Sequence, residues 1–285
     1  MKISLQHVDH IYREGGVSET AALRDVDLTI DSGELVAVIG HGGSGKSTLA
    51  LLMAGLYQPS SGRVELSGSK DPEHPFRSVG LVFQYPEQQL FGESVFEEVA
   101  FGARNHGTAE DYLPVKVREA LEQVGLDADA MWYRSPFSLS GGQKRRVCIA
   151  GVLVMDPQLI ILDEPTAGLD EGGRKWIAQL VRGLNEEGRT VVWITHNMAE
   201  AAEVASRVIV LKEGRVLLDG PPQQVFSEEE ILASAHLTPP PAARLVRELR
   251  RRGWDIPAQA VTVEGAAGEI LARLQASSGK EGGHA

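Results

Sequence analysis

The sequence is short of cysteine, of positive charge and of long apolar runs, and each shortage excludes a class of protein. A single cysteine, Cys148, excludes an intrachain disulfide and fits a reducing, cytoplasmic compartment. No stretch approaches 18 consecutive apolar residues and the first residues form no apolar signal segment, so neither a membrane span nor an export signal is predicted. The formal net charge of −11, from 39 acidic and 28 basic residues, argues against broad electrostatic binding to nucleic acid.

The rest of the composition is ordinary for a globular protein. Hydrophobic residues make up 42% and charged residues 24% of the 285 positions, which is enough for one large α/β domain with a small appendage. Two basic clusters, at residues 144–146 and 250–252, are predicted to be solvated helix faces because the chain as a whole is acidic. Cys148 lies in an apolar run and is predicted to be a small buried hydrophobic residue.

Short apolar β-type runs alternate with helical patterns, which predicts a layered α/β domain with a largely parallel sheet. Buried strands are expected at residues 35–39, 79–83, 159–162 and 190–195. The first of them leads into a helix at residues 48–56. Ligands of parallel sheets bind beyond the carboxyl ends of the strands, so polar motifs that follow these runs are expected to converge in space.

The region between residues 84 and 156 is different, because its pattern is helical and predicts an insertion in the α/β core. Helices are expected there at residues 94–102, 115–124 and 143–155.

The C-terminal region is expected to be helical as well. The triplet Pro239, Pro240 and Pro241 opens an amphipathic helix, and a second short helix is expected at residues 269–274. We therefore divide the chain into a main domain at 1–225 with a helical subdomain at about 92–156, a C-terminal helical extension at 226–275 and a disordered tail at 276–285.

Residues 40–47 match the phosphate-binding pattern G-x-x-x-x-G-K-[ST]. Its glycines let backbone N–H groups face phosphate, Lys46 places a cation on the β- and γ-phosphates, and the Ser47 hydroxyl is a ligand for Mg²⁺. A simple glycine turn is the alternative, but the motif follows a strand and opens a helix. The residues predicted to bind ATP here are Gly40, His41, Gly42, Gly43, Ser44, Gly45, Lys46, Ser47 and Thr48.

The apolar run at 159–162 delivers two carboxylates at its end. Asp163 is placed to hold Mg²⁺, directly or through water, and Glu164 is placed to polarise the attacking water. Alone, an apolar run followed by Asp-Glu is often only a strand that enters a turn. Together with the phosphate-binding loop it predicts a site of ATP hydrolysis.

The segment Leu139-Ser140-Gly141-Gly142-Gln143 resembles the signature motif of the ABC ATPases and precedes Asp163 by about twenty residues, as in that family. The resemblance implies a P-loop NTPase fold with a RecA-like core, an antiparallel β-subdomain and a helical insertion. It further implies that ATP and Mg²⁺ are the cofactors and that two such chains close around two nucleotides. Four signature residues would contact the ATP of the opposite subunit: Ser140, Gly141, Gly142 and Gln143.

Four more residues match family elements in the family's order. Gln84 matches the glutamine that reaches Mg²⁺ and water, and Asp170 ends the D-loop, which crosses the dimer interface. His196 matches the switch histidine that contacts the γ-phosphate, so Glu164, His196 and Gln84 form the implied catalytic set. Tyr12 resembles the aromatic residue that stacks on adenine, its alternative being an exposed tyrosine at a strand end.

Within the ABC class, the chain is most similar to the second ATPase subunit of the energy-coupling factor (ECF) transporters. The stretch at 79–91, Val-Gly-Leu-Val-Phe-Gln-Tyr-Pro-Glu-Gln-Gln-Leu-Phe, and Val99-Ala100-Phe101-Gly102 carry this resemblance. It implies a second ATPase partner in a homo- or heterodimer, a membrane coupling subunit and a substrate-binding membrane subunit. It also implies uptake of vitamins or transition-metal ions, and a peripheral position on the cytoplasmic face of the membrane.

Three other functions are compatible with parts of the sequence. An ordinary ABC importer ATPase would have the same catalytic residues. A soluble ABC protein of translation or repair would usually carry two fused cassettes or a long coiled coil, and neither is present. A non-catalytic nucleotide-binding regulator would normally lack Glu164 or His196, and both are present.

Overall fold

The computed structural model, which describes residues 1–14 and 18–281, has a six-stranded central sheet in the order β5-β6-β7-β3-β8-β9. Its first five strands are parallel, and β9 is antiparallel to β8. The strands are β3 (Leu35–Ile39), β5 (Val79–Val82), β6 (Leu159–Asp163), β7 (Thr190–Thr195), β8 (Arg207–Lys212) and β9 (Arg215–Gly220). The predicted parallel core is therefore confirmed, and β3 and β7 have the predicted bounds.

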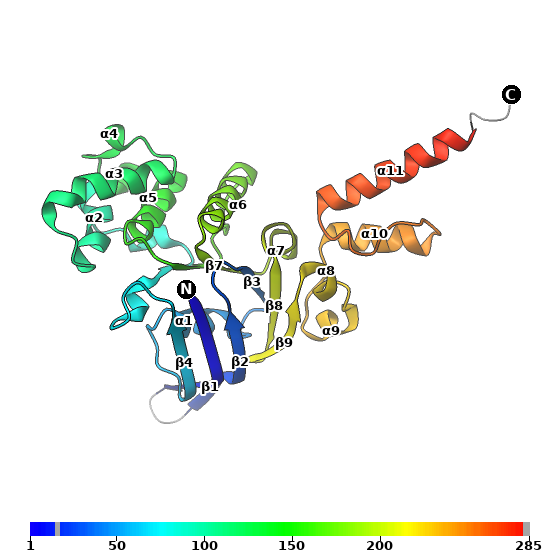
Figure 1. Ribbon diagram of the computed structural model, residues 1–285, viewed down its shortest axis with the longest axis horizontal. Helices are drawn as coiled ribbons and strands as arrows, with labels where there is room; N and C mark the ends of the chain where they lie inside the picture. The colour runs from blue at the N-terminus through cyan, green and yellow to red at the C-terminus, as the bar shows by residue number, and fades with distance from the viewer. Residues whose placement is uncertain (15–17, 282–285) are drawn as a thin grey trace.

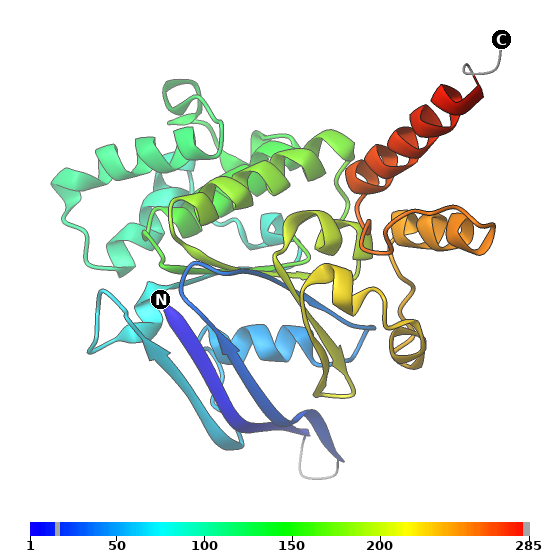
Figure 2. The ribbon, with the colours of Figure 1, turned by 45° about the vertical axis from the view of Figure 1, so that its right-hand side comes forward.

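A second, antiparallel sheet forms one side of the molecule in the order β2-β1-β4. Its strands are β1 (Lys2–Glu14), β2 (Ser18–Ile30) and β4 (Ser61–Ser67). Between the two sheets lies α1 (Lys46–Met53), as Figure 2 shows. Leu49 and Leu52 of α1 are fully buried against Ile3, Leu5 and Ile161, and this cluster holds the start of α1 beside the end of β3.

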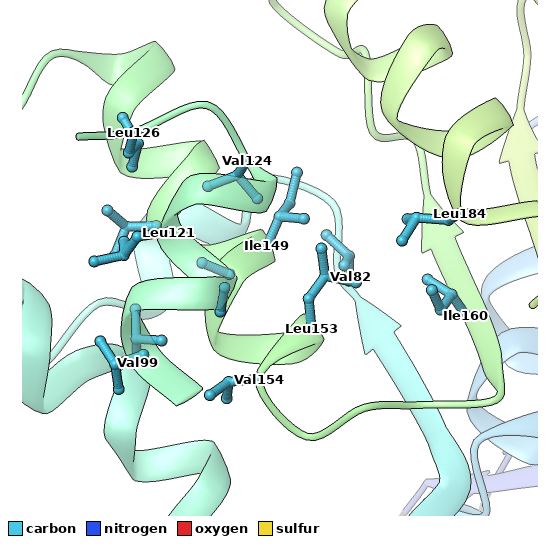
Figure 3. Close-up of a cluster of buried hydrophobic side chains, with 14 of the residues drawn as sticks. Val82, Val99, Leu121, Val124, Leu126, Ile149, Leu153, Val154, Ile160 and Leu184 are labelled. Atoms are coloured by element: carbon cyan, nitrogen blue, oxygen red, sulfur yellow. The ribbon is translucent and has the colours of Figure 1, made fainter. Parts of the chain in front are cut away.

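The helical insertion is a separate lobe in Figure 1. It contains α2 (Val95–Asn105), α3 (Leu113–Gln123), α4 (Ala128–Met131) and α5 (Gly141–Leu153), together with the short 3₁₀ helices η2 (Pro86–Gln89), η3 (Glu110–Tyr112) and η4 (Pro136–Ser138). Another 3₁₀ helix, η1 (Pro75–Ser78), lies outside the lobe and leads directly into β5. Figure 3 shows Leu153 of α5 beside Val82 of β5, with Ile160 of β6 farther into the sheet. Because one hydrophobic cluster runs from α2 and α3 into the sheet, the lobe is packed onto the core.

The face of the central sheet that points away from α1 is covered by α6 (Glu171–Glu186) and α7 (Met198–Val204). The chain continues as α8 (Pro222–Val225), α9 (Glu229–Ser234), α10 (Pro241–Arg251) and α11 (Val263–Glu281), and the last of these projects from the body (Figure 1). Leu232 of α9 belongs to the same buried cluster as Ala37 of β3, so α9 packs on the core. Ala242 and Val246 of α10 pack against Ala266 of α11. The proposed division of the chain into domains stays a prediction.

Two C-terminal predictions differ from the structure. The short helix expected at 269–274 is the middle of the longer α11, which begins after the Thr262 hydroxyl accepts a hydrogen bond from Gly265 N at 3.1 Å. The tail expected at 276–285 is helical as far as Glu281, because adding a residue to an existing helix needs no new nucleus. Residues 282–285 lie outside the described residues. No described helix has both the length and the apolar character needed to cross a bilayer.

The prediction that residues 144–146 form a solvated face is wrong. Arg145 is 3% exposed, and the guanidinium of Arg146 stacks over the ring of Trp176, 4.3 Å from its centroid. The local sequence shows only that these side chains are charged. The carbonyl groups that bind Arg145 and the aromatic ring that stacks on Arg146 belong to distant segments of the chain. The second cluster, 250–252, is exposed as predicted. Cys148 is half-buried, and this burial raises the pKa of its thiol to about 12.

Candidate active site

The phosphate-binding loop connects β3 to α1, and two of its glycines cannot be replaced. A Cβ at Gly40 would lie 2.5 Å from the Leu211 carbonyl oxygen, and a Cβ at Gly45, whose φ is +104°, would lie 2.5 Å from the Ala22 carbonyl oxygen. Backbone contact from β8 and β2 therefore shapes the loop into a cradle of N–H groups at the start of α1.

The Lys46 side chain folds back over this loop. Its ammonium donates to the carbonyl oxygens of Gly40, at 2.8 Å, and His41, at 3.0 Å. Burial lowers the pKa of Lys46 below its ordinary value, although the carboxylates of Glu164 and Asp163 oppose this shift. The buried Ser44 hydroxyl has no hydrogen-bond partner among the described residues. A phosphate group supplies both the negative charge and the acceptors that these groups require, so the loop fits ATP.

Asp163 ends β6 directly beside the start of α1, where the Ser47 hydroxyl donates to its carboxylate. Burial raises the pKa of Asp163 above its ordinary value, and the hydrogen bond from Ser47 and the charge of Lys46 oppose the shift. A carboxylate and a hydroxyl oxygen at the phosphate end of a P-loop are a fitting donor set for Mg²⁺.

Glu164 and His196 follow adjacent strands and meet. The His196 Nδ1 lies 2.8 Å from the Glu164 Oε1, and the Glu164 side chain is 11% exposed. The backbone N–H of Glu164 donates to the Ile194 carbonyl at 2.9 Å, and its φ of +49° is in the left-handed region that favours glycine. A non-glycine residue adopts this conformation at a cost in free energy and keeps it only where its surroundings hold it there. Here it brings the Glu164 carboxylate to the His196 ring, and the role of Glu164 as the base that activates water stays a prediction.

Tyr12 is brought to the loop from β1. Its hydroxyl lies 3.1 Å from the Thr48 hydroxyl of α1, and its ring packs edge-on against His10 and Tyr57. His10 and Tyr57 stack on each other, with ring planes 13° apart. Neither His10 nor Tyr57 could be identified from the sequence, because they lie 47 residues apart and only the packing of the sheet brings them together.

Gln84 follows β5, the strand beside β6, and so lies at the same edge of the sheet. Its side chain is exposed and makes no hydrogen bond within the described parts of the chain. Its role as a ligand of Mg²⁺ and water stays a prediction.

The signature and the D-loop lie on exposed turns. Ser140 begins α5, where its hydroxyl accepts from Gln143 N at 3.3 Å and Gln143 Oε1 accepts from Ser140 N at 3.1 Å. The Asp170 carboxylate caps α6 through Gly173 N at 2.8 Å. Throughout residues 1–14 and 18–281, no hydrogen bond joins either motif to the phosphate-binding loop. A single chain thus brings together the phosphate-binding loop, the two carboxylates, His196 and Tyr12. Within its described residues, it does not bring the signature motif or the D-loop to the same loop.

Replacing Asp163 with asparagine is expected to raise the thermal stability of the nucleotide-free protein at pH 7. Burial in the folded state disfavours the ionised carboxylate of Asp163. The protonated side chain therefore stabilises the folded state below the pKa of the unfolded chain, and this stabilisation is lost as pH rises through the raised pKa of the folded state. Removing this charge should raise Tm by about 2–4 °C, for about 1 kcal/mol. Thermal unfolding at pH 7 and pH 4.5 measures this gain, which should shrink at the lower pH. A lower Tm at pH 7 would contradict the assignment of burial as the dominant effect.

Known proteins resemble this chain in sequence and in structure. Residues 23–167 match the family described as ABC transporter. The chain is 48% identical to the energy-coupling factor transporter ATP-binding protein EcfA2 of Symbiobacterium thermophilum over 99% of both chains. It is 43% identical to the EcfA2 protein of Caldanaerobacter subterraneus, covering 96% of this chain and 98% of that protein.

Solved structures resemble it too. One is cbiO1 from Clostridium perfringens, part of the ABC transporter complex cbiONQ, with a TM-score of 0.69 and 36% identity over 88% of this chain and 96% of that one. Another is the ATP-binding cassette MJ0796 in a dimeric post-hydrolysis state bound to ADP and Pi, with a TM-score of 0.67 and 30% identity over 77% of this chain and 98% of that one.

Proposed function

The chain belongs to the ABC transporter ATPases of the energy-coupling factor type, and from this membership we propose that it powers uptake of vitamins or transition-metal ions through membrane partner subunits. It is an ATP-hydrolysing enzyme that uses ATP with Mg²⁺. Its pairing with one second ATPase, one coupling subunit and one substrate-binding membrane subunit is part of the proposal, as is its place on the cytoplasmic face of the membrane.

One observation supports the proposal most strongly. The Glu164–His196 contact lies at the strand ends beside the phosphate-binding loop, whereas Ser140 and Asp170 are exposed and make no described hydrogen bond to that loop. A helix N-terminus such as that of α5 attracts anions, so an exposed one suits a phosphate held by another subunit. A second ATPase that closes on this face would complete two nucleotide sites.

The proposed cycle uses the residues of both halves. ATP binds to the phosphate-binding loop, and Ser140 of the facing subunit engages the γ-phosphate as the dimer closes. Ser47 and Asp163 would hold Mg²⁺, which would offset the negative charge of the phosphates. Glu164 and His196 position water for in-line attack, while Lys46 and the backbone N–H groups stabilise the charge on the transferred phosphoryl group. The dimer reopens after hydrolysis, and this motion is passed to the membrane subunits.

An apolar groove of about 540 Å³ supports the proposed docking to a membrane subunit. Residues of η2, α2 and α5 line it, and Phe91 and Phe101 at its wall are 59% and 46% exposed. Tyr85, just before η2, is 41% exposed. Exposed aromatic residues around a concave apolar surface are typical of a helix-binding groove.

The test is to purify the tagged full-length chain from its native membranes in mild detergent. A second ATP-binding subunit and two different membrane proteins should co-purify with it. The complex in proteoliposomes should accumulate a labelled vitamin or metal ion only when ATP is supplied on the ATPase side. Co-purification with a permease pair that depends on a soluble binding protein would instead identify an ordinary ABC importer and overturn the proposal.

A further inference from the structure

Arg145 places a buried cation in the second turn of α5. Its side chain is 4% exposed, and its neighbours in the helix, Val147 and Ile149, belong to the hydrophobic cluster of the helical lobe. A guanidinium taken out of water is costly unless charges and carbonyls around it replace the lost hydration. Its partners therefore show what the side chain does.

The first partner is Glu87 in the middle of η2. Arg145 Nη2 lies 3.0 Å from Glu87 Oε1, and Nε lies 3.2 Å from Oε2, which is the two-pronged geometry that only arginine offers to a carboxylate. Glu87 stands between Pro86 and Gln89, and both of these residues line the apolar groove. One end of the ion pair therefore lies on the segment that forms the groove wall.

The second partner is the turn that follows Glu164. Arg145 Nη1 donates to the carbonyl oxygens of Pro165, at 3.2 Å, and Ala167, at 2.7 Å. These carbonyls lie between the strained Glu164 and the D-loop aspartate, Asp170. A single planar guanidinium thus connects the groove wall to the backbone that carries the catalytic carboxylate.

We infer that Arg145 is a positioning residue that couples the state of the groove to the placement of Glu164 and of the D-loop. An occupant of the groove that shifts η2 moves Glu87, and the guanidinium passes the shift to the Pro165 and Ala167 carbonyls. The role of the groove rests on the proposed function. Neither Arg145 nor Glu87 contacts the phosphate-binding loop in the described structure, so the coupling acts on turnover rather than on ATP binding.

The experiment uses Arg145→Lys and Glu87→Gln in the full-length chain within its purified membrane complex. Lysine keeps the charge but cannot reach Glu87 and two carbonyls at once, and glutamine keeps the shape but loses the charge. Each variant should lower kcat for ATP hydrolysis about 10-fold and leave KM for ATP within about 2-fold. The double variant should lose no more than the more damaging single variant, because both interrupt one connection.

Arg146→Lys is the matched control, because it makes the same arginine-to-lysine change at the residue next to Arg145. Arg146 donates to the carbonyls of Val124 and Gly125 and, among the described residues, makes no hydrogen bond to the 165–167 turn, so turnover should stay within about 2-fold of the wild type. Thermal unfolding of each variant separates misfolding from lost positioning.

Wild-type kcat in both Arg145→Lys and Glu87→Gln would overturn the inference, as would a rise in KM that matches the fall in kcat. Failure of the proposed function is a separate result. A wild-type complex that hydrolyses ATP without moving any cargo would reject the transport role and still leave the comparison of kcat values between variants valid.

Discussion

Glu164→Gln is expected to abolish ATP turnover while nucleotide binding persists. Glutamine has the same shape, so the buried side chain keeps its place beside His196, but it cannot accept a proton from water. General-base catalysis contributes about 10²–10⁴-fold to a rate, so kcat should fall at least about 100-fold. The dissociation constant for ATP should stay within about 3-fold, because the loop and Lys46 are unchanged. Phosphate release and equilibrium binding of a fluorescent ATP analogue measure the two quantities separately.

The chain offers a close control for this substitution. Glu213 is an exposed glutamate with the same left-handed backbone, at φ +49°, in the turn between β8 and β9. Glu213→Gln should leave turnover within about 2-fold of the wild type. Wild-type hydrolysis by Glu164→Gln in the assembled complex would remove Glu164 from its role as the base.

Lys46→Ala is expected to weaken ATP binding and to remove turnover. The Lys46 ammonium is already held over the loop by two carbonyl oxygens, which places the cation beside the predicted site of the β- and γ-phosphates. Its loss removes a charge-assisted contact made both to bound ATP and to the transition state. We expect ATP affinity to fall at least about 10-fold and kcat at least about 100-fold. Titration calorimetry and steady-state hydrolysis check these values.

The pH dependence of ATP affinity provides a second measurement on the same residue. Burial lowers the pKa of Lys46 in the free protein, and a bound triphosphate raises it again. The complex therefore takes up a proton between the two pKa values. ATP affinity should be flat below the lowered pKa and fall as pH rises through it, and this fall should vanish in Lys46→Ala. Lys70→Ala, which removes an exposed ion pair with Asp156, should keep both the affinity and its pH profile. An unchanged affinity in Lys46→Ala would reject the assigned role.

The strands of the core could be predicted closely from the sequence. β3 and β7 are buried along their whole length. The sequence of β3 is therefore a continuous apolar run, and that of β7 is an apolar run between two threonines. The phosphate-binding motif and the Asp163-Glu164 pair are equally local, because each side chain acts within a few residues of the strand that positions it. The structure of such segments can therefore be predicted without knowing which distant residues they contact.

Other features could not be predicted, because their partners lie far away in the chain. Tyr12 and Thr48 are 36 residues apart and meet only because the antiparallel sheet packs over α1. Arg145 lies in an ordinary basic sequence. Its hydrogen-bond partners Glu87, Pro165 and Ala167 lie 58, 20 and 22 residues away, and they allow the guanidinium to be buried. The first turn of α11 is held by the packing of Ala266 against α10, which no local pattern reveals.

The sequence by itself determined the parallel α/β core, the positions of the polar motifs at the strand ends and membership of the ABC class, because apolar runs and polar motifs act over short distances along the chain. Only the tertiary structure decided that Glu164 meets His196 and that Ser140 and Asp170 lie exposed. It also decided that Arg145 connects the groove to the turn that follows Glu164. Those outcomes depend on which strands are neighbours and which surfaces pack together. They follow from the way in which all the apolar surfaces of the chain are buried together, and no single segment determines that arrangement.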